Sequence, residues 1–288
     1  MSSRDRRPPP RRRPAPTKKG SGTWMLLLAG VAALGAFAAF KNRGSDTPPV
    51  KTATEAPPVS FTIPEGLRRE DIAAKLTAET RLSGTEYLRQ SAESNRGRSF
   101  AGTSGVRSLE GFLFPATYQI GSKTTVADLI QSQLNAYAAN TRKVRYVAAR
   151  AKNLTPYEVL IIASMIEREA RIAADRPLIA SVIYNRLHAQ MRLDIDATTQ
   201  YAVGSWKTNL TQSDLNNPSP YNTRKARGLP PGPIANPGLA SIEAAAHPAK
   251  SNYLFYVAKG DGSGGSYFAA TDADFQAAIA KAKANAGG

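Results

Sequence analysis

Residues 155–187 limit the fold more than any other part of the chain, because they read as two consecutive helices with little between them. Thr155 can cap the first helix, Pro156 suits its first turn, and Glu158 completes a Ser/Thr-x-x-Glu capping box. The apolar run 159–163 follows directly. A helix this apolar does not lie on a surface, so we expect it to be buried on most sides.

Two carboxylates stand at the end of this first helix. Glu167 and Glu169 flank Arg168 within one turn after the apolar run. Burial raises the pKa of a carboxyl group, which makes it a usable proton donor near neutral pH. The pattern equally fits the solvated end of a core helix, and the helical wheel does not favour one glutamate. Asp175 and Pro177 begin a second helix, which ends near residues 184–187.

The residue types that the chain lacks exclude several kinds of site. Its 288 residues include no cysteine and two histidines, so disulfides, thiolate nucleophiles and Cys-ligated zinc are excluded. A His-rich metal site or a Ser-His-Asp triad is not favoured. We therefore expect chemistry from carboxylate, hydroxyl and amide groups.

The N-terminal region carries the largest charge imbalance. Residues 1–19 hold eight basic residues against one acidic residue, which predicts a disordered, basic, Pro-rich tail. Residues 20–40 carry no charge, and at about 1.5 Å per residue they span roughly 30 Å, enough for one membrane crossing. We predict an uncleaved transmembrane helix. A cleaved signal peptide is the alternative, since Ala36-Phe37-Ala38 resembles a cleavage site.

This charge arrangement also bears on the partners of the chain. A net charge of +16 suggests nucleic-acid binding. The basic side of a membrane span stays in the cytoplasm, however, so everything after Lys41 should be exported. An exported region meets no genomic DNA. We therefore predict no nucleic-acid partner, a cytoplasmic (inner) membrane location, a cytoplasmic N-terminus and a single crossing.

After a predicted linker over residues 41–58, a small subdomain is expected over residues 59–105. Residues 59–63 alternate as a half-buried strand, Pro64-Glu65-Gly66 turns the chain, and short helices are expected near 72–76 and 85–92. A strand, a Pro-x-Gly turn and a short helix resemble the opening of LysM-like modules, which bind cell-wall glycans. A plain structural subdomain is the alternative.

Residues 106–284 are expected to form a mainly helical domain. Residues 126–152 predict one long helix or two shorter ones, and 239–246 predict another helix. The Pro- and Gly-rich segment 217–238 predicts a long ordered loop, and such loops tend to be functional. Strands at 253–258 and 267–270 predict a hairpin, followed by a helix capped by Thr271. The predicted fold class is α+β, with this C-terminal β-hairpin.

Two further segments carry polar groups that suit sugar binding. Residues 109–118 set Glu110 among aromatic side chains, which stack on pyranose rings; an aromatic core segment with an exposed glutamate is the alternative. Residues 191–201 bring together two carboxylates and three hydroxyl side chains. Two aspartates at i and i+2 without a Gly-containing loop do not make an EF-hand.

Six pieces of the sequence, taken in order, resemble the YceG-like (MltG) family of endolytic murein transglycosylases. They are LEGFLFPATY (109–118), ASMIERE (163–169), VIYNRL (182–187), MRLDIDATTQY (191–201), SPYNTR (219–224) and GLPPGPIANPG (228–238). The resemblance covers roughly residues 59–280. It departs from the family at the C-terminus, where Ser266-Tyr267-Phe268 and Asp274-Phe275 replace a frequent histidine and an acidic-His pair. Ala197 stands where the family has proline.

The resemblance implies a membrane-anchored lytic transglycosylase. Such an enzyme cleaves the MurNAc–GlcNAc β-1,4 bond within nascent glycan strands, leaves 1,6-anhydroMurNAc ends and so ends strand elongation. The resemblance implies no metal and no cofactor. The implied partners are peptidoglycan strands, the cytoplasmic membrane and, as candidates, peptidoglycan synthases. The family's catalytic acid is the first Glu of its Glu-Lys/Arg-Glu pattern, which is Glu167 here. The residues we expect to orient the sugar are Glu110, Asn185, Asp196, Tyr221, Asn222 and Thr223.

Two alternatives stay open at this point. One is a non-catalytic cell-wall-binding or division scaffold, in which the carboxylates only hold structure. The other is a muramidase that pairs Glu167 with Asp196 or Glu110, because hydrolysis of a glycoside needs two carboxylates.

Overall fold

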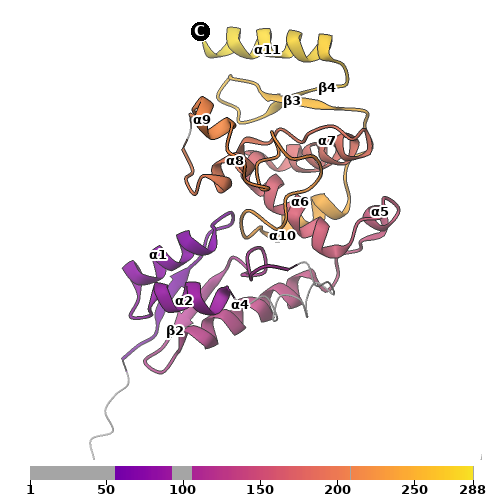
Figure 1. Ribbon diagram of the computed structural model, residues 1–288. Helices are drawn as coiled ribbons and strands as arrows, with labels where there is room; N and C mark the ends of the chain where they lie inside the picture. The colour runs from indigo at the N-terminus through magenta and orange to yellow at the C-terminus, as the bar shows by residue number, and fades with distance from the viewer. Residues whose placement is uncertain (1–55, 93–105, 208, 288) are drawn as a thin grey trace, which may run out of the picture. The chain divides into compact units, whose positions relative to one another are not determined.

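The computed structural model describes residues 56–92, 106–207 and 209–287 (Figure 1). All of them belong to the second of two units of the chain, Ala53–Gly288. The predicted tail, membrane helix and nearly all of the predicted linker lie outside the described residues. None of the described helices combines the length and apolar content needed to cross a membrane.

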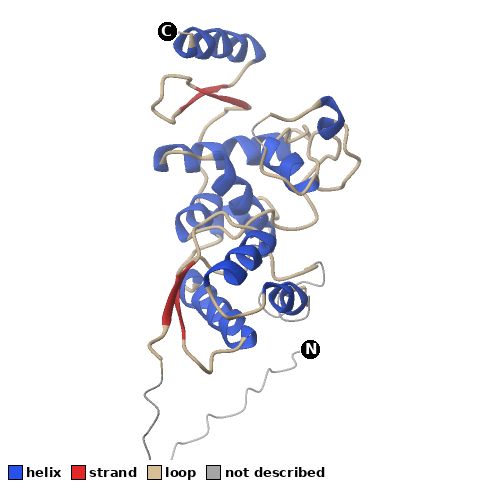
Figure 2. Cartoon of the chain, turned by 90° about the vertical axis from the view of Figure 1, so that its left-hand side faces the viewer, coloured by secondary structure: helices blue, strands red, loops and turns tan. Residues whose placement is uncertain are grey.

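The first part of the fold is a pair of strands with two helices. Strand β1 (Val59–Thr62) runs antiparallel to β2 (Thr117–Ile120), and α1 (Arg69–Glu79) and α2 (Gly84–Ser91) lie between them in sequence. The two strands are the red pair beside the lower helices in Figure 2. Phe61 and Ile63 are buried while Ser60 and Thr62 are exposed, as the predicted alternation requires, but Val59 at the start of the strand is 48% exposed.

Helices α1 and α2 approach each other closely. A Cβ at Gly84 would lie 2.2 Å from the Ala73 carbonyl oxygen, so only glycine fits at this crossing. The buried side of α1 is formed by Ile72, Ala73 and Leu76. Both helices agree with the sequence prediction, and glycine allows them to share one small core.

The sheet does not follow the predicted division at residue 105. Its second strand begins at Thr117, and the partner of Val59 in the ladder is Ile120. Helix α4 (Val126–Thr141) also packs against α2. The strand pair therefore joins residues on both sides of the predicted boundary, because β1 finds its hydrogen-bonding partner beyond it.

Helix α6 (Pro156–Glu169) runs through the middle of the larger, helical part (Figure 1). Its capping box forms as predicted: the Thr155 hydroxyl accepts from the Glu158 N–H at 3.2 Å, and the Glu158 carboxylate accepts from the Thr155 N–H at 2.7 Å. Every residue from Val159 to Ile166 is buried. The prediction of a helix buried on most sides is confirmed.

Two neighbours cover α6. Helix α7 (Arg176–His188) follows a short 3-10 turn, η1 (Ala173–Asp175), and α10 (Leu239–Ala246) makes the most extensive contact with α6. Before α6, the predicted region 126–152 forms two helices, α4 and α5 (Val147–Arg150). Both α7 and α10 agree with the sequence prediction.

The segment between α7 and α10 contains two short helices that the sequence pattern does not predict, α8 (Asp196–Ala202) and α9 (Gln212–Leu215). Residues 216–238 then form the predicted long ordered loop. Its second half enters the core: Ile234 and Ala235 are fully buried, and the Ile234 N–H donates to the Ser164 hydroxyl at 3.0 Å. The loop is therefore fixed directly on α6.

The chain closes with the predicted hairpin and helix. Strands β3 (Phe255–Ala258) and β4 (Ser266–Ala269) pair antiparallel, and α11 (Asp272–Ala286) begins with the Thr271 hydroxyl accepting from the Asp274 N–H at 3.2 Å. Two small sheets among helices confirm the α+β class and the C-terminal hairpin.

Candidate active site

Glu167 lies in the last turn of α6, where the buried helix reaches the surface. Its side chain is partly buried, and its Oε2 accepts a hydrogen bond from the Gly238 N–H at 3.0 Å. Gly238 is the N-cap residue of α10. The partial positive charge of a helix N-terminus favours an anionic group there, so α10 orients this carboxylate.

A second carboxylate, from Glu65, reaches the same glycine. Glu65 belongs to the turn between β1 and α1, and a Cβ at Gly238 would lie 1.8 Å from its Oε1. The pKa of Glu65 is raised first by burial and then by the negative charge of Glu167, while the positive charge of Arg176 opposes the rise. Sequence reasoning predicts only a turn at Glu65.

The turn that carries Glu65 is clamped to α6 by Arg168. The guanidinium of Arg168 donates to the Gly66 carbonyl at 3.2 Å and lies 4.0 Å from the centre of the Trp206 ring. Arg68 contacts the same ring at 4.9 Å, and the Trp206 N–H donates to Asp71 at 2.8 Å. Burial lowers the pKa of Arg168.

Glu169 points to a different part of the molecule. Its carboxylate accepts from the Tyr256 hydroxyl at 3.0 Å and from the Ala197 N–H at 3.5 Å, and burial raises its pKa. It therefore links α6 to the C-terminal hairpin and to the start of α8. The two glutamates that the helical wheel does not separate have different surroundings.

Glu110 is a buried carboxylate that supports the loop before α10. It is 2% exposed and accepts from the Asn236 amide at 2.7 Å and from the Arg69 N–H at 3.2 Å. The amide oxygen of Asn236 accepts in turn from the N–H groups of Gly111 and Leu113. Burial raises the pKa of Glu110 to about 8.

The predicted loop residues Tyr221, Asn222 and Thr223 are placed by contacts within the protein. Asn222 is fully buried and donates to the carbonyl oxygens of Leu215 and Asn217 at 3.1 and 2.8 Å. Thr223 is 1% exposed and shares a 2.8 Å hydrogen bond with the Thr198 hydroxyl. Tyr221 is partly exposed and lies with its ring 4.8 Å from that of Tyr201.

The remaining two predicted sugar-binding residues differ in exposure. Asn185 donates to the Ser251 and Tyr253 carbonyl oxygens at 3.0 and 2.9 Å, which fixes the segment before β3 on α7. The side chain of Asp196 is 57% exposed and pairs with Arg224. All six sugar-contact assignments stay predictions; Glu110, Asn222 and Thr223 are buried, whereas Asn185, Asp196 and Tyr221 are at least partly exposed.

Comparison with known proteins decides the family. The family model described as YceG-like matches residues 39–281. The chain belongs to the YceG-like family.

Relatives and a solved structure agree with this assignment. A Bacillus subtilis protein named endolytic murein transglycosylase is 37% identical over 239 residues, which cover 77% of this chain and 66% of that protein. A Streptococcus pneumoniae protein of the same name is 43% identical over 161 residues, 54% of this chain and 29% of that protein. A crystal structure of a yceG-like protein from Listeria monocytogenes aligns with a TM-score of 0.69 at 34% identity, covering 77% and 76% of the two chains.

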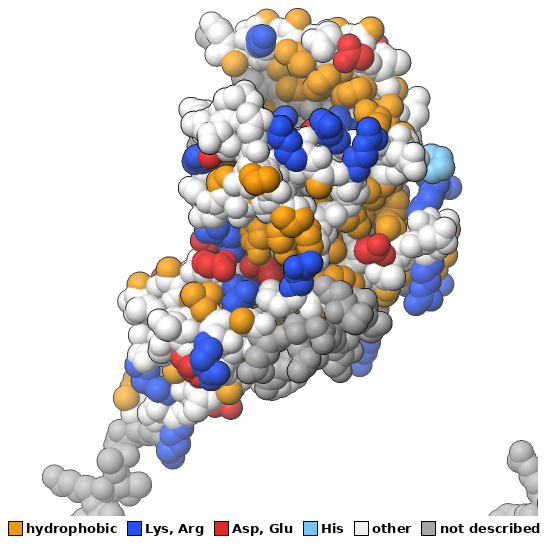
Figure 3. Space-filling model, viewed as in Figure 1, with side chains coloured by type: hydrophobic (Ala, Val, Ile, Leu, Met, Phe, Trp, Pro, Cys, Tyr) orange, Lys and Arg blue, Asp and Glu red, His pale blue; other side chains and the backbone are white. Residues whose placement is uncertain are grey.

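Acidic and apolar side chains lie side by side where the β1–α2 region meets the larger helical part. Figure 3 shows acidic side chains gathered beside an apolar patch, on the face where the β1–α2 region meets the larger helical part. Within the described residues, no group of three or more His, Cys, Asp or Glu side chains is placed to hold a metal ion.

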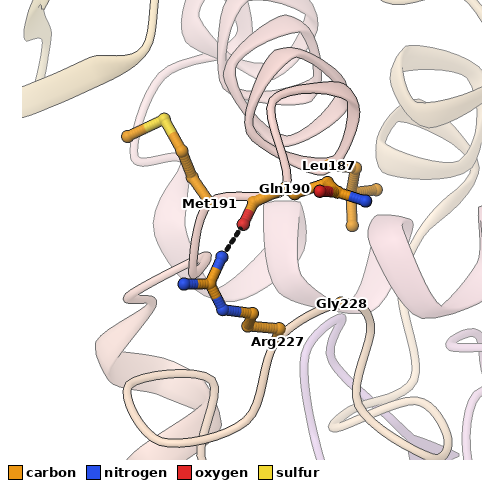
Figure 4. A pocket seen from close by; sticks show the side chains of 5 residues that line it. All are labelled: Leu187, Gln190, Met191, Arg227 and Gly228. Atoms are coloured by element: carbon orange, nitrogen blue, oxygen red, sulfur yellow. Dashed lines mark hydrogen bonds between the residues drawn. The ribbon is translucent and has the colours of Figure 1, made fainter.

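Two cavities lie along the loop around Gly228, one at the end of α7 and the other at the N-terminal half of α6. One of about 480 Å³ is lined by Leu187, Gln190, Met191, Arg227 and Gly228, and in Figure 4 the Arg227 guanidinium points to the Gln190 carbonyl. The other, of about 540 Å³, is lined by Leu154, Thr155, Tyr157, Glu158, Ile161, Leu187, Gly228, Leu229, Pro230 and Pro231. Neither contains Glu167 or Glu65.

Proposed function

We propose that this YceG-like chain is a membrane-anchored endolytic lytic transglycosylase of peptidoglycan, with Glu167 as its acid and base. The observation that carries the proposal is the position of Glu167, at the surface end of a buried helix and held by one backbone hydrogen bond. The name that curated relatives share supports the reaction class. The apolar and acidic surface at the junction suits a sugar chain.

The proposed reaction needs one proton-transferring carboxyl group. Glu167 donates its proton to the glycosidic oxygen between MurNAc and GlcNAc, and the bond from that oxygen to C1 breaks. The muramyl C6 hydroxyl oxygen then bonds to C1, and its proton passes to the Glu167 carboxylate. Because this nucleophile belongs to the same sugar, it supplies a high effective concentration without water.

Product analysis tests this proposal. Purified protein is incubated with uncrosslinked glycan strands, and the new ends are separated by mass. Strand ends that carry 1,6-anhydroMurNAc would support a lytic transglycosylase. Reducing MurNAc ends would instead identify a muramidase. Strands that stay intact would favour the non-catalytic binding scaffold. An endolytic enzyme should also lower the mean strand length before disaccharides accumulate.

The location and the glycan-binding role are part of the proposal. Residues 20–40 would anchor the chain in the cytoplasmic membrane with its catalytic part outside, and the β1–α2 region would act as a LysM-like glycan contact. A reporter that works only outside the cytoplasm, fused to the C-terminus, should be active. The fusion protein should still carry its N-terminal tail. A mature N-terminus near Ala39 would show a cleaved signal instead.

A further inference from the structure

We propose that Glu65 is a second catalytic carboxylate of this centre, which stabilises the positive charge that develops on the muramyl ring while Glu167 transfers the proton. This inference rests on the proposed transglycosylase function. It adds to the active site a residue from the β1–α1 turn, outside the helical part that carries Glu167.

Gly238 is the point at which the two carboxylates meet. Glu167 accepts the Gly238 N–H at 3.0 Å, while the Glu65 carboxylate occupies the space in which a Gly238 side chain would stand. A Cβ there would lie 1.8 Å from Oε1 and 2.1 Å from Cδ of Glu65. Glycine at this position therefore leaves room for Glu65 above the backbone that holds Glu167.

Several independent contacts fix the turn that carries Glu65 beside Gly238. The Gly66 N–H donates to the Asn236 carbonyl at 2.9 Å, and the Asn236 N–H donates to the Leu67 carbonyl at 2.9 Å. Arg168 donates to the Gly66 carbonyl from the side of α6. A turn fixed to both the loop and the catalytic helix can present a side chain with the precision that catalysis needs.

The charges around Glu65 act in opposite directions. Glu167 is the main charged neighbour that raises the pKa of Glu65, so the two groups interact electrostatically, and Arg176 favours the ionised form of Glu65. The other carboxylates considered for a pair have different partners. Asp196 is paired with Arg224, and Glu110 is enclosed with Asn236.

Two neighbouring carboxylates can take different roles when their environments differ. Glycoside cleavage passes through an oxocarbenium-like state in which the ring carbon C1 gains positive charge. An ionised Glu65 next to that carbon would lower the energy of this state. The bonds made and broken remain those of the Glu167 reaction, and Glu65 takes no proton.

The test compares Glu65→Gln and Glu65→Ala with Glu79→Gln, a matched surface glutamate on the adjacent helix α1. We measure kcat and KM for formation of anhydro ends from uncrosslinked strands, with folding checked by thermal unfolding. Removing one preorganised electrostatic group costs about a hundredfold in rate. We expect kcat of both Glu65 variants to fall by about that factor with KM nearly unchanged, and Glu79→Gln to match the wild type.

A second variant displaces Glu65 without removing it. Gly238→Ala puts a methyl group into the space of the Glu65 carboxylate but keeps the N–H that binds Glu167, and φ −74°, ψ 169° is open to alanine. We expect Gly238→Ala to lower kcat as Glu65→Ala does. Adding it to Glu65→Ala should then cost little more, since the two changes remove the same interaction.

The pH profile separates a catalytic from a structural role. If the ionised form of Glu65 is needed, kcat/KM rises with pH through the pKa of Glu65, and this acidic limb disappears in Glu65→Gln. A rise in KM alone, an unchanged acidic limb, or additive losses in the double variant would overturn the proposal. Failure of the function itself is distinct: it would appear as wild-type protein that makes no anhydro ends.

Discussion

At its N-terminus α6 is capped by its own neighbours in sequence, whereas its C-terminus is held by residues from distant parts of the chain. The cap needs only Thr155 and Glu158, three positions apart. The other end depends on Gly238 and Gly66, which are 71 and 102 residues away from their partners on α6. The N-terminal end only starts the helix, whereas the C-terminal end brings distant segments together around Glu65 and Glu167.

This difference explains where chemistry can arise in the fold. A locally satisfied cap leaves its carboxylate, Glu158, bonded to Thr155. At the other end, Glu167 and Glu169 find different long-range partners and so acquire different environments. The following predictions test this contrast between the two ends, from the largest expected effect to the smallest.

Glu167→Gln should have the largest effect, and it should fall on activity. Glutamine keeps an oxygen that can accept the Gly238 N–H, but it cannot donate or take the proton. General acid–base help is worth about 10²–10⁴-fold, so formation of anhydro ends should drop at least a hundredfold with thermal unfolding unchanged.

Glu169→Gln is the matched control for Glu167→Gln. It should cost much less activity, because Glu169 bonds Tyr256 and Ala197 away from Gly238. Normal turnover by folded Glu167→Gln together with an inactive Glu169→Gln would show that the wrong carboxylate had been chosen.

Trp206→Ala should come next, with an effect on both stability and activity. The substitution removes the ring between Arg68 and Arg168 and the hydrogen bond to Asp71. Loss of a partly buried aromatic with cation–π contacts should lower the free energy of unfolding by about 2–3 kcal/mol. Denaturant unfolding measures this.

Trp206→Phe keeps a ring and loses only the N–H donor. It should cost about 1 kcal/mol. Equal losses in the Ala and Phe variants would show that the arginine contacts with the ring contribute nothing to holding the β1–α1 turn.

Glu110 should make stability depend on pH. In the unfolded chain this carboxyl ionises near its ordinary pKa of 4.5, whereas in the fold it keeps its proton up to about pH 8. The folded state therefore binds more protons between these values. Its stability should fall as pH rises through this window, by at most about 1.4 kcal/mol per pH unit, and level off above it.

Glu110→Gln isolates this contribution. Its amide can serve only one of the two donors at Asn236 and Arg69, so the variant should be less stable than the wild type at pH 5. The gap measured by thermal unfolding should narrow toward pH 8. A gap that is constant over this range would contradict the assignment.

Thr155→Ala should have the smallest effect, and it should leave activity alone. Loss of the N-cap acceptor costs about 1 kcal/mol. The cap lies at the opposite end of α6 from Glu167, so the kcat for anhydro-end formation should stay at the wild-type value. A large loss of activity would show that the two ends are coupled through the helix.

The same contrast sets how much could be predicted from sequence. Helices with local caps, such as α6 and α11, are predicted because Thr155 and Thr271 act on residues three positions away. Strand β1 is also predicted, but its pairing with β2 is not, because an alternating pattern does not indicate which strand lies beside it. Helix α8 escapes prediction because its N-cap residue, Ile195, has no capping side chain, and the Ala197 N–H in its first turn contacts the distant Glu169 instead.

The site follows this rule as well. Glu167 and Glu169 are visible in the sequence as carboxylates after an apolar run, and the family resemblance favours Glu167. Glu65 gives no such signal, because a Pro-x-Gly turn accounts for it completely. Only the fold shows its carboxylate at Gly238.

The contacts between the β1–α1 turn and Asn236 also determine how much of the chain must be synthesised before Glu65 and Glu167 can come together. The Asn236 amide donates to the Leu67 carbonyl across 169 residues, one of the longest loops the chain closes. A chain emerges with its N-terminus first, so Glu65 and Glu167 are made well before the segment that joins them. No nascent chain that ends before Gly238 can hold both carboxylates in place. The proposed cutting activity can therefore arise only after Gly238 has been synthesised.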